Sequence, residues 1–306
     1  MAQVVIPANL AATVVAWEGD SGRAWLARVP SIVNELADAW DLDVGPPYEP
    51  GGNISWVAPV RRRGDGTDAV LKVQHPHPES APEPIALAAW DGAGAVHLLA
   101  HDAGRCALLL ERCEPGSALA DEPDPLAAAR IGGAVGARLH AMAPPSGLPS
   151  LAEVLTPWAD QLDGQLQAHP AADPGLARRA LATMRQPLDD ATRQVLLHGD
   201  LNPTNVLAAT REPWLAIDPK PMVGDAAYDG PRLVWQPDPL RATDPAALVA
   251  TRLGIVTERL AVEPPGLAEW CLVAAVEVGV SAAARGDAGT AEQCRAHIAL
   301  IAPHLA

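Results

Sequence analysis

Hydrophobic and polar residues follow two different periods along the first third of the chain, and each period predicts a different kind of element. Between residues 21 and 40, apolar side chains such as Trp25 recur at helical spacing, which predicts a helix. Pro30 falls inside this stretch, and we expect it to kink the helix or split it in two. Residues 53–62 and 68–74 instead alternate apolar and polar side chains around the turn-forming sequence RRGDGT. These two stretches are therefore predicted to form an antiparallel hairpin.

The pattern then predicts a second helix and a second pair of strands. Residues 82–90 are typical of a short helix, and residues 95–113 of two strands that turn near Asp102. The polar, proline-containing stretch 114–125 indicates a connection between lobes. We therefore predict a small α+β lobe over residues 1–112.

Beyond this connection the chain becomes mainly helical. Residues 125–142 place apolar side chains on one helical face, and helical patterns return towards the C-terminus. The exception is the stretch 195–218, which is strand-like at both ends. The prediction is an α+β fold of two lobes, in which a small antiparallel β-sheet precedes a mainly helical lobe over residues 113–306.

Charge and composition narrow the class of partner. The formal net charge of the chain is -15, which disfavours nucleic acid and anionic membranes and attracts cations. A small cationic molecule fits this field, and we expect neither nucleic acid nor membrane as a partner. An acidic charge is also common among cytosolic proteins of many functions, so by itself it leaves the partner open.

Cysteine spacing and hydropathy indicate a cytoplasmic protein. The four cysteines form no C-x-x-C pair, so neither a zinc site nor a redox motif is expected. The N-terminus lacks the basic region of a signal peptide. The most apolar late stretch, residues 270–280, carries Glu277 and is expected to be too short and too polar to cross a bilayer. We expect a monomer or a weak homodimer.

The stretch 195–218 carries an unusual density of polar groups between apolar runs. An apolar strand delivers Asp200 to a loop, and two further strand-like runs form a hairpin that begins at Asn205 and ends at Asp218. Simple geometry brings these three side chains towards one point. Phosphoryl transfer uses such a set: one carboxylate orients the attacking hydroxyl, and an amide oxygen and a second carboxylate hold Mg²⁺. Singly, each residue is also explained as a turn or cap residue.

Two motifs in this stretch carry a family resemblance. The sequence HGDLNPTN resembles the H-G-D-x-x-x-x-N loop of aminoglycoside phosphotransferases. The sequence LAIDPKPMVGDAAYD resembles the segment that follows it in the streptomycin 6-phosphotransferase and hydroxyurea-kinase branch. The resemblance implies a two-lobed protein-kinase-like fold with ATP and Mg²⁺ as cofactors. It also implies Asp200 as the catalytic base and Asn205 and Asp218 as the magnesium ligands.

The same resemblance assigns residues of the first lobe to the nucleotide. Lys72 would hold the phosphates from a strand, oriented by Glu83 on the next helix, with Glu79 as the competing partner. Ser55, behind two glycines, would bond to phosphate, although two glycines also suit an ordinary hairpin turn.

The adenine ring would meet the backbone of the connection near Glu111 and Cys113. This expectation rests on position only, because no side-chain chemistry is needed there.

Other polar residues of the second lobe have a structural and a functional interpretation. His198 is expected to brace the loop, and Asp225 and Asp229 to hold loop geometry or line the substrate entrance. Glu269 and Glu277, like Glu263, could bind guanidinium or ammonium groups, but a solvated helix face is the default expectation.

The expected activity is ATP-dependent phosphorylation of a hydroxyl group on a small antibiotic, with an aminoglycoside of the streptomycin type as the leading acceptor. Hydroxyurea, a sugar or another antibiotic stays open, because acceptor choice depends on the variable helices. A non-catalytic nucleotide-binding pseudokinase is the alternative from another class.

Overall fold

The computed structural model describes residues 4–78, 80–169, 171, 173–186 and 194–305. Glu79 lies outside the described residues. The chain divides into two compact units, Met1–Gly116 (unit 1) and Ser117–Ala306 (unit 2), each described below by itself.

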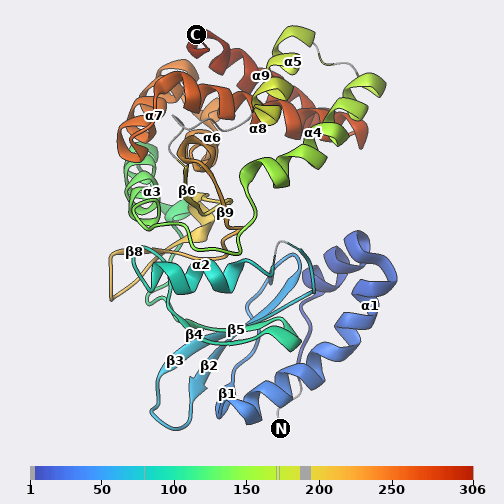
Figure 1. Ribbon diagram of the computed structural model, residues 1–306, viewed down its shortest axis with the longest axis vertical. Helices are drawn as coiled ribbons and strands as arrows, with labels where there is room; N and C mark the ends of the chain where they lie inside the picture. Colours follow the sequence, from blue (N-terminus) through green and yellow to red (C-terminus); the bar gives the residue numbers. More distant parts are fainter. Residues whose placement is uncertain (1–3, 79, 170, 172, 187–193, 306) are drawn as a thin grey trace. The chain divides into compact units, whose positions relative to one another are not determined.

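Unit 1 is a five-stranded antiparallel sheet with two helices (Figure 1). The strand order is β1-β2-β3-β5-β4, so β3 lies in the middle, between β2 and β5. The predicted hairpin, short helix and second strand pair are all present. In chain order the elements are α1 (Ala8–Ala39), β1 (Leu42–Val44), β2 (Ser55–Arg62), β3 (Asp68–Gln74), α2 (Glu83–Trp90), β4 (Leu98–Asp102), the 3₁₀ turn η1 (Ala103–Arg105) and β5 (Ala107–Glu111).

The first helix differs from the prediction in both its start and its break. Helix α1 begins at Ala8, well before residue 21, and its one non-helical residue is Gly19, with φ 56° and ψ -123°. Pro30 does not split the helix, because the backbone stays helical there. The fixed φ of proline suits a helix, whereas the positive φ at residue 19 is a conformation that glycine adopts at little cost.

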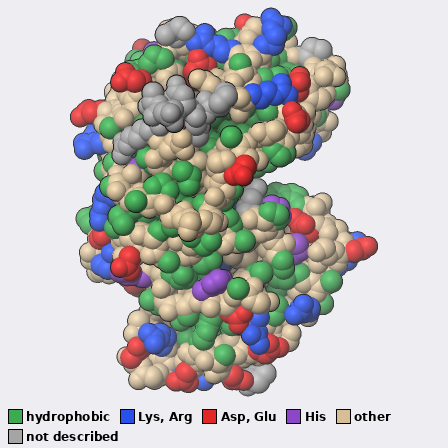
Figure 2. Space-filling view, in the orientation of Figure 1, with side chains coloured by type: hydrophobic (Ala, Val, Ile, Leu, Met, Phe, Trp, Pro, Cys, Tyr) green, Lys and Arg blue, Asp and Glu red, His purple; other side chains and the backbone are tan. Residues whose placement is uncertain are grey.

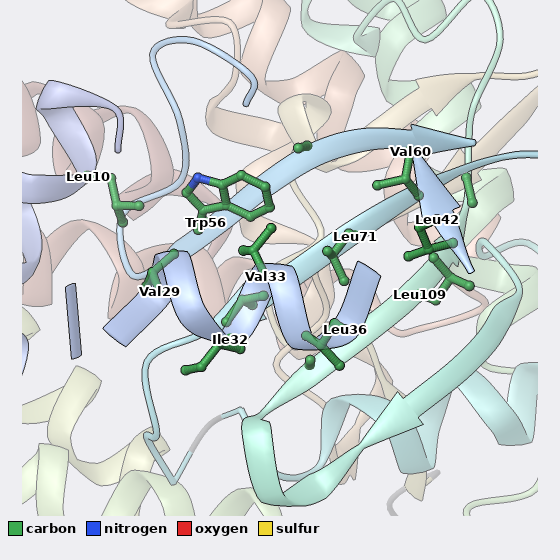
Figure 3. Close-up of a cluster of buried hydrophobic side chains, with 14 of the residues drawn as sticks. Leu10, Val29, Ile32, Val33, Leu36, Leu42, Trp56, Val60, Leu71 and Leu109 are labelled. Atoms are coloured by element: carbon green, nitrogen blue, oxygen red, sulfur yellow. The ribbon is translucent and has the colours of Figure 1, made fainter. Parts of the chain in front are cut away.

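The hydrophobic core of unit 1 lies between α1 and one face of the sheet (Figure 3). Val29, Val33 and Leu36 of α1 face strand residues such as Leu71 and Leu109. Side chains of a strand point alternately to opposite faces. Since Leu71 and its second neighbour Val73 face this core, Lys72 points to the other face of the sheet.

Unit 2 is mainly helical and carries two small antiparallel sheets, β6 with β9 and β7 with β8. Its helices are α3 (Pro125–Leu139), α4 (Leu151–Ala168), α5 (Pro174–Arg185), α6 (Pro231–Trp235), α7 (Pro245–Leu260), α8 (Pro264–Ala284) and α9 (Ala288–Ile301). Its strands are β6 (Gln194–Leu197), β7 (Val206–Ala208), β8 (Trp214–Ala216) and β9 (Met222–Asp225). Short 3₁₀ turns are η2 (Leu119–Asp121), η3 (Pro203–Asn205), η4 (Ala226–Asp229), η5 (Pro239–Arg241) and η6 (Ala302–His304).

Local signals explain where several of these helices begin. Asp124 and Asp244 each cap a helix whose first residue is proline, and their carboxylates accept bonds from Leu126 N and Ala247 N. An N-cap carboxylate accepts hydrogen bonds from backbone N–H groups that have no partner within the helix. Proline suits the first helical position because it has no backbone N–H that would need a partner.

Helix α8 is longer than the apolar stretch 270–280 suggests. It spans 21 residues, and by length and composition alone it is long and apolar enough to cross a membrane, so the expectation that this stretch is too short is wrong. About 56% of its most apolar window is nevertheless buried inside the protein. Its neighbours are the helices α4, α5, α6, α7 and α9. The hydrophobicity of α8 is therefore explained by its place in the core of unit 2.

Acidic and basic side chains are interspersed over each unit on the face drawn in Figure 2. On this face the described residues form no broad basic patch, the feature that typifies nucleic-acid binding.

Candidate active site

A buried ion pair joins the central strand of unit 1 to α2. Lys72 Nζ lies 2.8 Å from Oε1 and 2.7 Å from Oε2 of Glu83, and Gln74 Nε2 donates to Oε2 at 2.6 Å. The side chains of Lys72 and Glu83 are only 6% and 1% exposed. Taking two charges out of water costs about as much as their attraction returns, so such a pair is weak evidence for stability alone. It points to a functional role on this face of the sheet.

Glu83 is placed by the start of its helix. It is the first residue of α2, with a proline on either side. A carboxylate in the first turn is stabilised by the positive end of the helix dipole and by unpaired backbone N–H groups. The short helix therefore presents a carboxylate partner to Lys72.

The other predicted nucleotide residues lie at, or just beyond, the ends of the internal strands β2 and β5. Ser55 starts β2 directly opposite Gln74 and is buried. Gly52 lies close to it, since a Cβ there would approach Ser55 O to 2.9 Å. Glu111 ends β5, and its carboxylate accepts a bond from His97 N at 2.9 Å. Cys113 follows in half-buried position. Their roles towards a nucleotide stay predictions.

In unit 2, β6 leads into a loop that only glycine permits. Gly199 has φ +79°, and a Cβ at this residue would lie 1.9 Å from Lys220 O. Lys220 N in turn donates to His198 O at 2.8 Å. The segment after β8 therefore lies directly against the loop that carries Asp200.

His198 braces this loop as a neutral imidazole. Its Nδ1 accepts from Asp200 N at 3.3 Å, which leaves Nε2 to donate to Ile217 O at 3.0 Å. Burial lowers the pKa of His198 despite the carboxylates around it. One side chain thus ties the backbone of Asp200 to the residue before Asp218.

A second brace is the fully buried carboxylate of Asp229. It accepts bonds from His198 N, Gly199 N and His140 Nε2, each at 2.8 Å. Burial acts to raise the pKa of Asp229, but the hydrogen bonds from His140 and the backbone outweigh it, and the pKa is lowered. Of the two roles expected for Asp229, the geometry supports holding the loop.

His140 was missed by the sequence analysis. It ends α3 and is buried, and it lies 89 positions from its partner Asp229. A lone histidine at the end of an apolar helix resembles an ordinary core residue, so only the long-range contact identifies it.

Amide groups orient the carboxylate of Asp200. Asn202 Nδ2 donates to Oδ1 at 3.0 Å, and Asn205 Nδ2 donates to Oδ2 at 3.2 Å. Asn202 also caps the turn η3 by accepting from Thr204 N and Asn205 N. Asn202 therefore both shapes the turn and holds Asp200.

Asp218 reaches the same loop through backbone bonds. Ile217 N donates to Asn205 O at 2.9 Å, and Asp218 follows with a φ of +55°. The described side-chain bonds of Asn205 are donated by Nδ2, which leaves Oδ1 turned away from Asp200. The structure thus brings Asp200, Asn205 and Asp218 together around one loop.

This donor set suits magnesium better than zinc. Among the described residues, no group of three or more His, Cys, Asp or Glu side chains could hold a metal. Mg²⁺ prefers hard oxygen ligands and commonly takes only one or two from protein, with water and phosphate supplying the rest. Asn205 Oδ1 and the Asp218 carboxylate fit that requirement.

Glu269 and Asp225 lie near a small cavity rather than on a solvated face. Arg179 Nε donates to Glu269 at 2.7 Å, and Trp270 Nε1 donates to Asp225 at 2.8 Å. Both carboxylates line a cavity of about 100 Å³. The default expectation of a solvated helix face is therefore wrong for Glu269.

Glu277 also departs from a solvated helix face. It is half-buried on α8, and burial raises its pKa against the opposing effect of Arg232. Tyr228 of η4, which packs edge-on against Trp270, is within electrostatic range of both Glu277 and Asp200. Glu277 thus lies in a partly buried environment on α8. Glu263, in contrast, is exposed at the start of α8.

Comparison with known proteins shows that the chain is similar to antibiotic-modifying kinases. A family model described as aminoglycoside/hydroxyurea antibiotic resistance kinase matches residues 43–286. A streptomycin 6-kinase from Streptomyces glaucescens is 37% identical over 272 residues, which cover 87% of each chain. A hydroxyurea phosphotransferase from Kitasatospora aureofaciens is 40% identical over 237 residues, 74% of this chain and 67% of that protein.

A solved structure supports the fold. A thermostable mutant of an aminoglycoside phosphotransferase, in complex with ADP and hygromycin B, matches 88% of this chain and 98% of its own with a TM-score of 0.57. At 16% identity this likeness bears on the fold alone. The predicted protein-kinase-like α+β fold, with an antiparallel sheet first and a mainly helical remainder, is confirmed.

Proposed function

The chain belongs to the aminoglycoside/hydroxyurea antibiotic resistance kinase family, and from this premise we propose that it transfers the γ-phosphoryl group of ATP to a hydroxyl group of an aminoglycoside of the streptomycin type. As a member of this family it is a phosphotransferase that acts on hydroxyl groups. The observation that carries the proposal is the loop in which amides hold both oxygens of Asp200 next to Asn205 and Asp218.

Asp200 is the group that accepts the proton of the attacking hydroxyl. Its two carboxylate oxygens are held in fixed directions by Asn202 and Asn205, as a base that must meet one hydroxyl requires. Asn205 and Asp218 would hold Mg²⁺, which when bound supplies positive charge against the transferring phosphate. His198 and Asp229 keep the loop in this geometry.

Unit 1 supplies the nucleotide contacts in this proposal. Lys72, oriented by Glu83, binds the α- and β-phosphates of ATP, and Ser55 adds a hydrogen bond to phosphate. The backbone near Glu111 and Cys113 binds adenine. Residues 1–112 are then the nucleotide-binding lobe, and residues 113–306 carry the catalytic loop and the acceptor helices.

The acceptor in this proposal is a cation. The net charge of -15 favours cationic ligands, and the relative matched over 87% of this chain is a streptomycin 6-kinase. The half-buried carboxylate of Glu277 is a natural partner for a guanidinium or ammonium group. A cytoplasmic location and a monomeric or weakly dimeric state belong to the same proposal.

Hydroxyurea is the second candidate acceptor, because the relative with 40% identity is a hydroxyurea phosphotransferase. Magnesium-dependent ADP release with streptomycin, other aminoglycosides, hydroxyurea and simple amino sugars separates the two. We expect strong turnover with streptomycin. Turnover with hydroxyurea alone would show that hydroxyurea, and not an aminoglycoside, is the acceptor. ATP binding without turnover on any acceptor would favour a pseudokinase.

A further inference from the structure

The chain uses lysine at only two positions. Of its 22 lysine and arginine residues, all but Lys72 and Lys220 are arginines. The two side chains are not interchangeable, since lysine is a compact, mobile point charge and arginine a planar fork that holds carboxylates with two bonds. Lys72 already has a proposed phosphate-binding role, so the position of the other lysine is informative.

Lys220 lies in the candidate active site, two residues after Asp218. Its Nζ lies 3.2 Å from Asp218 Oδ2, with side chains 24% and 40% exposed. Its backbone is fixed on both sides, because Lys220 N donates to His198 O and Lys220 O fills the space where residue 199 lacks a Cβ. Prolines precede and follow it. The side chain therefore starts from a fixed point beside the loop of Asp200.

Stability does not explain this lysine. A partly exposed ion pair contributes less than about 1 kcal/mol, and an arginine would hold the carboxylate at least as well. Apart from Lys72 and Lys220, every permanently charged base in the ion pairs of the described residues is an arginine, as in Arg63 with Asp43 and Arg179 with Glu269. An ammonium differs in that it can leave Asp218 readily and turn towards another oxygen anion.

We propose that Lys220 is a second phosphate-binding lysine, which pairs with Asp218 in the free protein and bonds to a non-bridging oxygen of the γ-phosphoryl group when nucleotide and metal bind. The inference rests on the proposed function. In the transfer, the acceptor hydroxyl oxygen forms a bond to the γ-phosphorus. The bond from that phosphorus to the β–γ bridging oxygen breaks, its electron pair leaves with ADP, and the hydroxyl proton passes to Asp200. Lys220 keeps its proton and stabilises the charge on the transferring group.

The test compares Lys220→Met and Lys220→Arg with the wild type, with Arg23→Met as a control that removes an exposed ion pair of unit 1. Two quantities are measured: turnover of ATP and streptomycin, and the affinity of the protein–ADP complex for Mn²⁺ by electron paramagnetic resonance. We expect Lys220→Met to lower kcat about 100-fold or more, as loss of one preorganised donor does. Its Mn²⁺ affinity should be equal or tighter, because a competitor for Asp218 is gone.

Lys220→Arg should have a kcat as low as that of Lys220→Met. It should bind Mn²⁺ more weakly than the wild type, because a guanidinium holds Asp218 with two bonds. If Lys220 merely positions Asp218, Lys220→Met will lose Mn²⁺ affinity together with turnover, which would overturn the inference. Wild-type kcat in Lys220→Met would overturn it as well. A wild type that turns over no acceptor would refute the proposed function instead, and the Mn²⁺ affinities would still decide whether Lys220 competes for Asp218.

Discussion

Replacing Asp229 with asparagine tests whether a buried carboxylate holds the catalytic loop. The carboxylate accepts three hydrogen bonds, two of them from the backbone of the loop. Asparagine has one acceptor oxygen, so its amide nitrogen must face at least one of these donors. His140 can adapt by moving its proton to the other ring nitrogen, but a backbone N–H cannot.

The cost follows from this count. The cheapest orientation in Asp229→Asn leaves at least one buried N–H unpaired, at about 1–3 kcal/mol, and also loses charge-assisted bonds. We expect the free energy of unfolding to fall by about 2–4 kcal/mol. Turnover should fall about 100-fold, because a displacement of about 1 Å at the reacting groups has that effect.

The pH dependence has a definite sign. The pKa of Asp229 is lowered in the folded protein, so its stabilisation is present above the ordinary aspartate range and is lost as pH falls through the folded pKa. The difference in unfolding free energy between wild type and Asp229→Asn should therefore shrink below about pH 4.

Urea unfolding of both proteins across pH, with steady-state turnover at neutral pH, measures these effects. Asp244→Asn is the matched control, since Asp244 is an exposed helix cap and asparagine caps equally well. A loss below about 0.5 kcal/mol in Asp229→Asn, with normal turnover, would refute the bracing role.

Three further substitutions or labels test other parts of the site. Gly199→Ala should lower both stability and turnover, because its Cβ would meet Lys220 O at 1.9 Å, whereas Gly286→Ala, at a similar φ with open space around it, should cost only about 1 kcal/mol; equal losses in thermal unfolding would contradict the steric argument. Glu83→Gln should raise the KM for ATP and lower the free energy of unfolding, since it leaves the buried charge of Lys72 without its carboxylate. An unchanged KM would show that this pair does not act in nucleotide binding. Alkylation followed by mass spectrometry should modify half-buried Cys113 and spare buried Cys271, whose pKa is raised by burial; Mg²⁺-ATP should slow the reaction at Cys113, and an unaltered rate would place adenine elsewhere.

Local patterns explain which parts of the fold were predictable. The alternation along residues 68–74 is a property of one strand, so it identified β3, the strand that carries Lys72. Turn-forming residues and short spacing likewise brought Asp200, Asn205 and Asp218 to one loop. The start of α1 was missed because a glycine with positive φ interrupts its periodicity.

Long-range contacts account for what remained hidden. Nothing near His140 in the sequence indicates a partner 89 positions away. The bond between Arg179 and Glu269 joins residues 90 positions apart, so Glu269 resembled a solvated side chain. Such pairs are defined by how helices pack, which periodicity along one helix does not contain.

The role of Asp200 is tested most directly by phosphoryl transfer with wild type and Asp200→Asn, measured with γ-labelled ATP and streptomycin, alongside ATP affinity by calorimetry. We expect labelled streptomycin with the wild type, loss of transfer in Asp200→Asn, and nearly unchanged ATP binding. Transfer by Asp200→Asn at a near-normal rate would contradict the assignment of Asp200 as the base on which the proposed reaction depends.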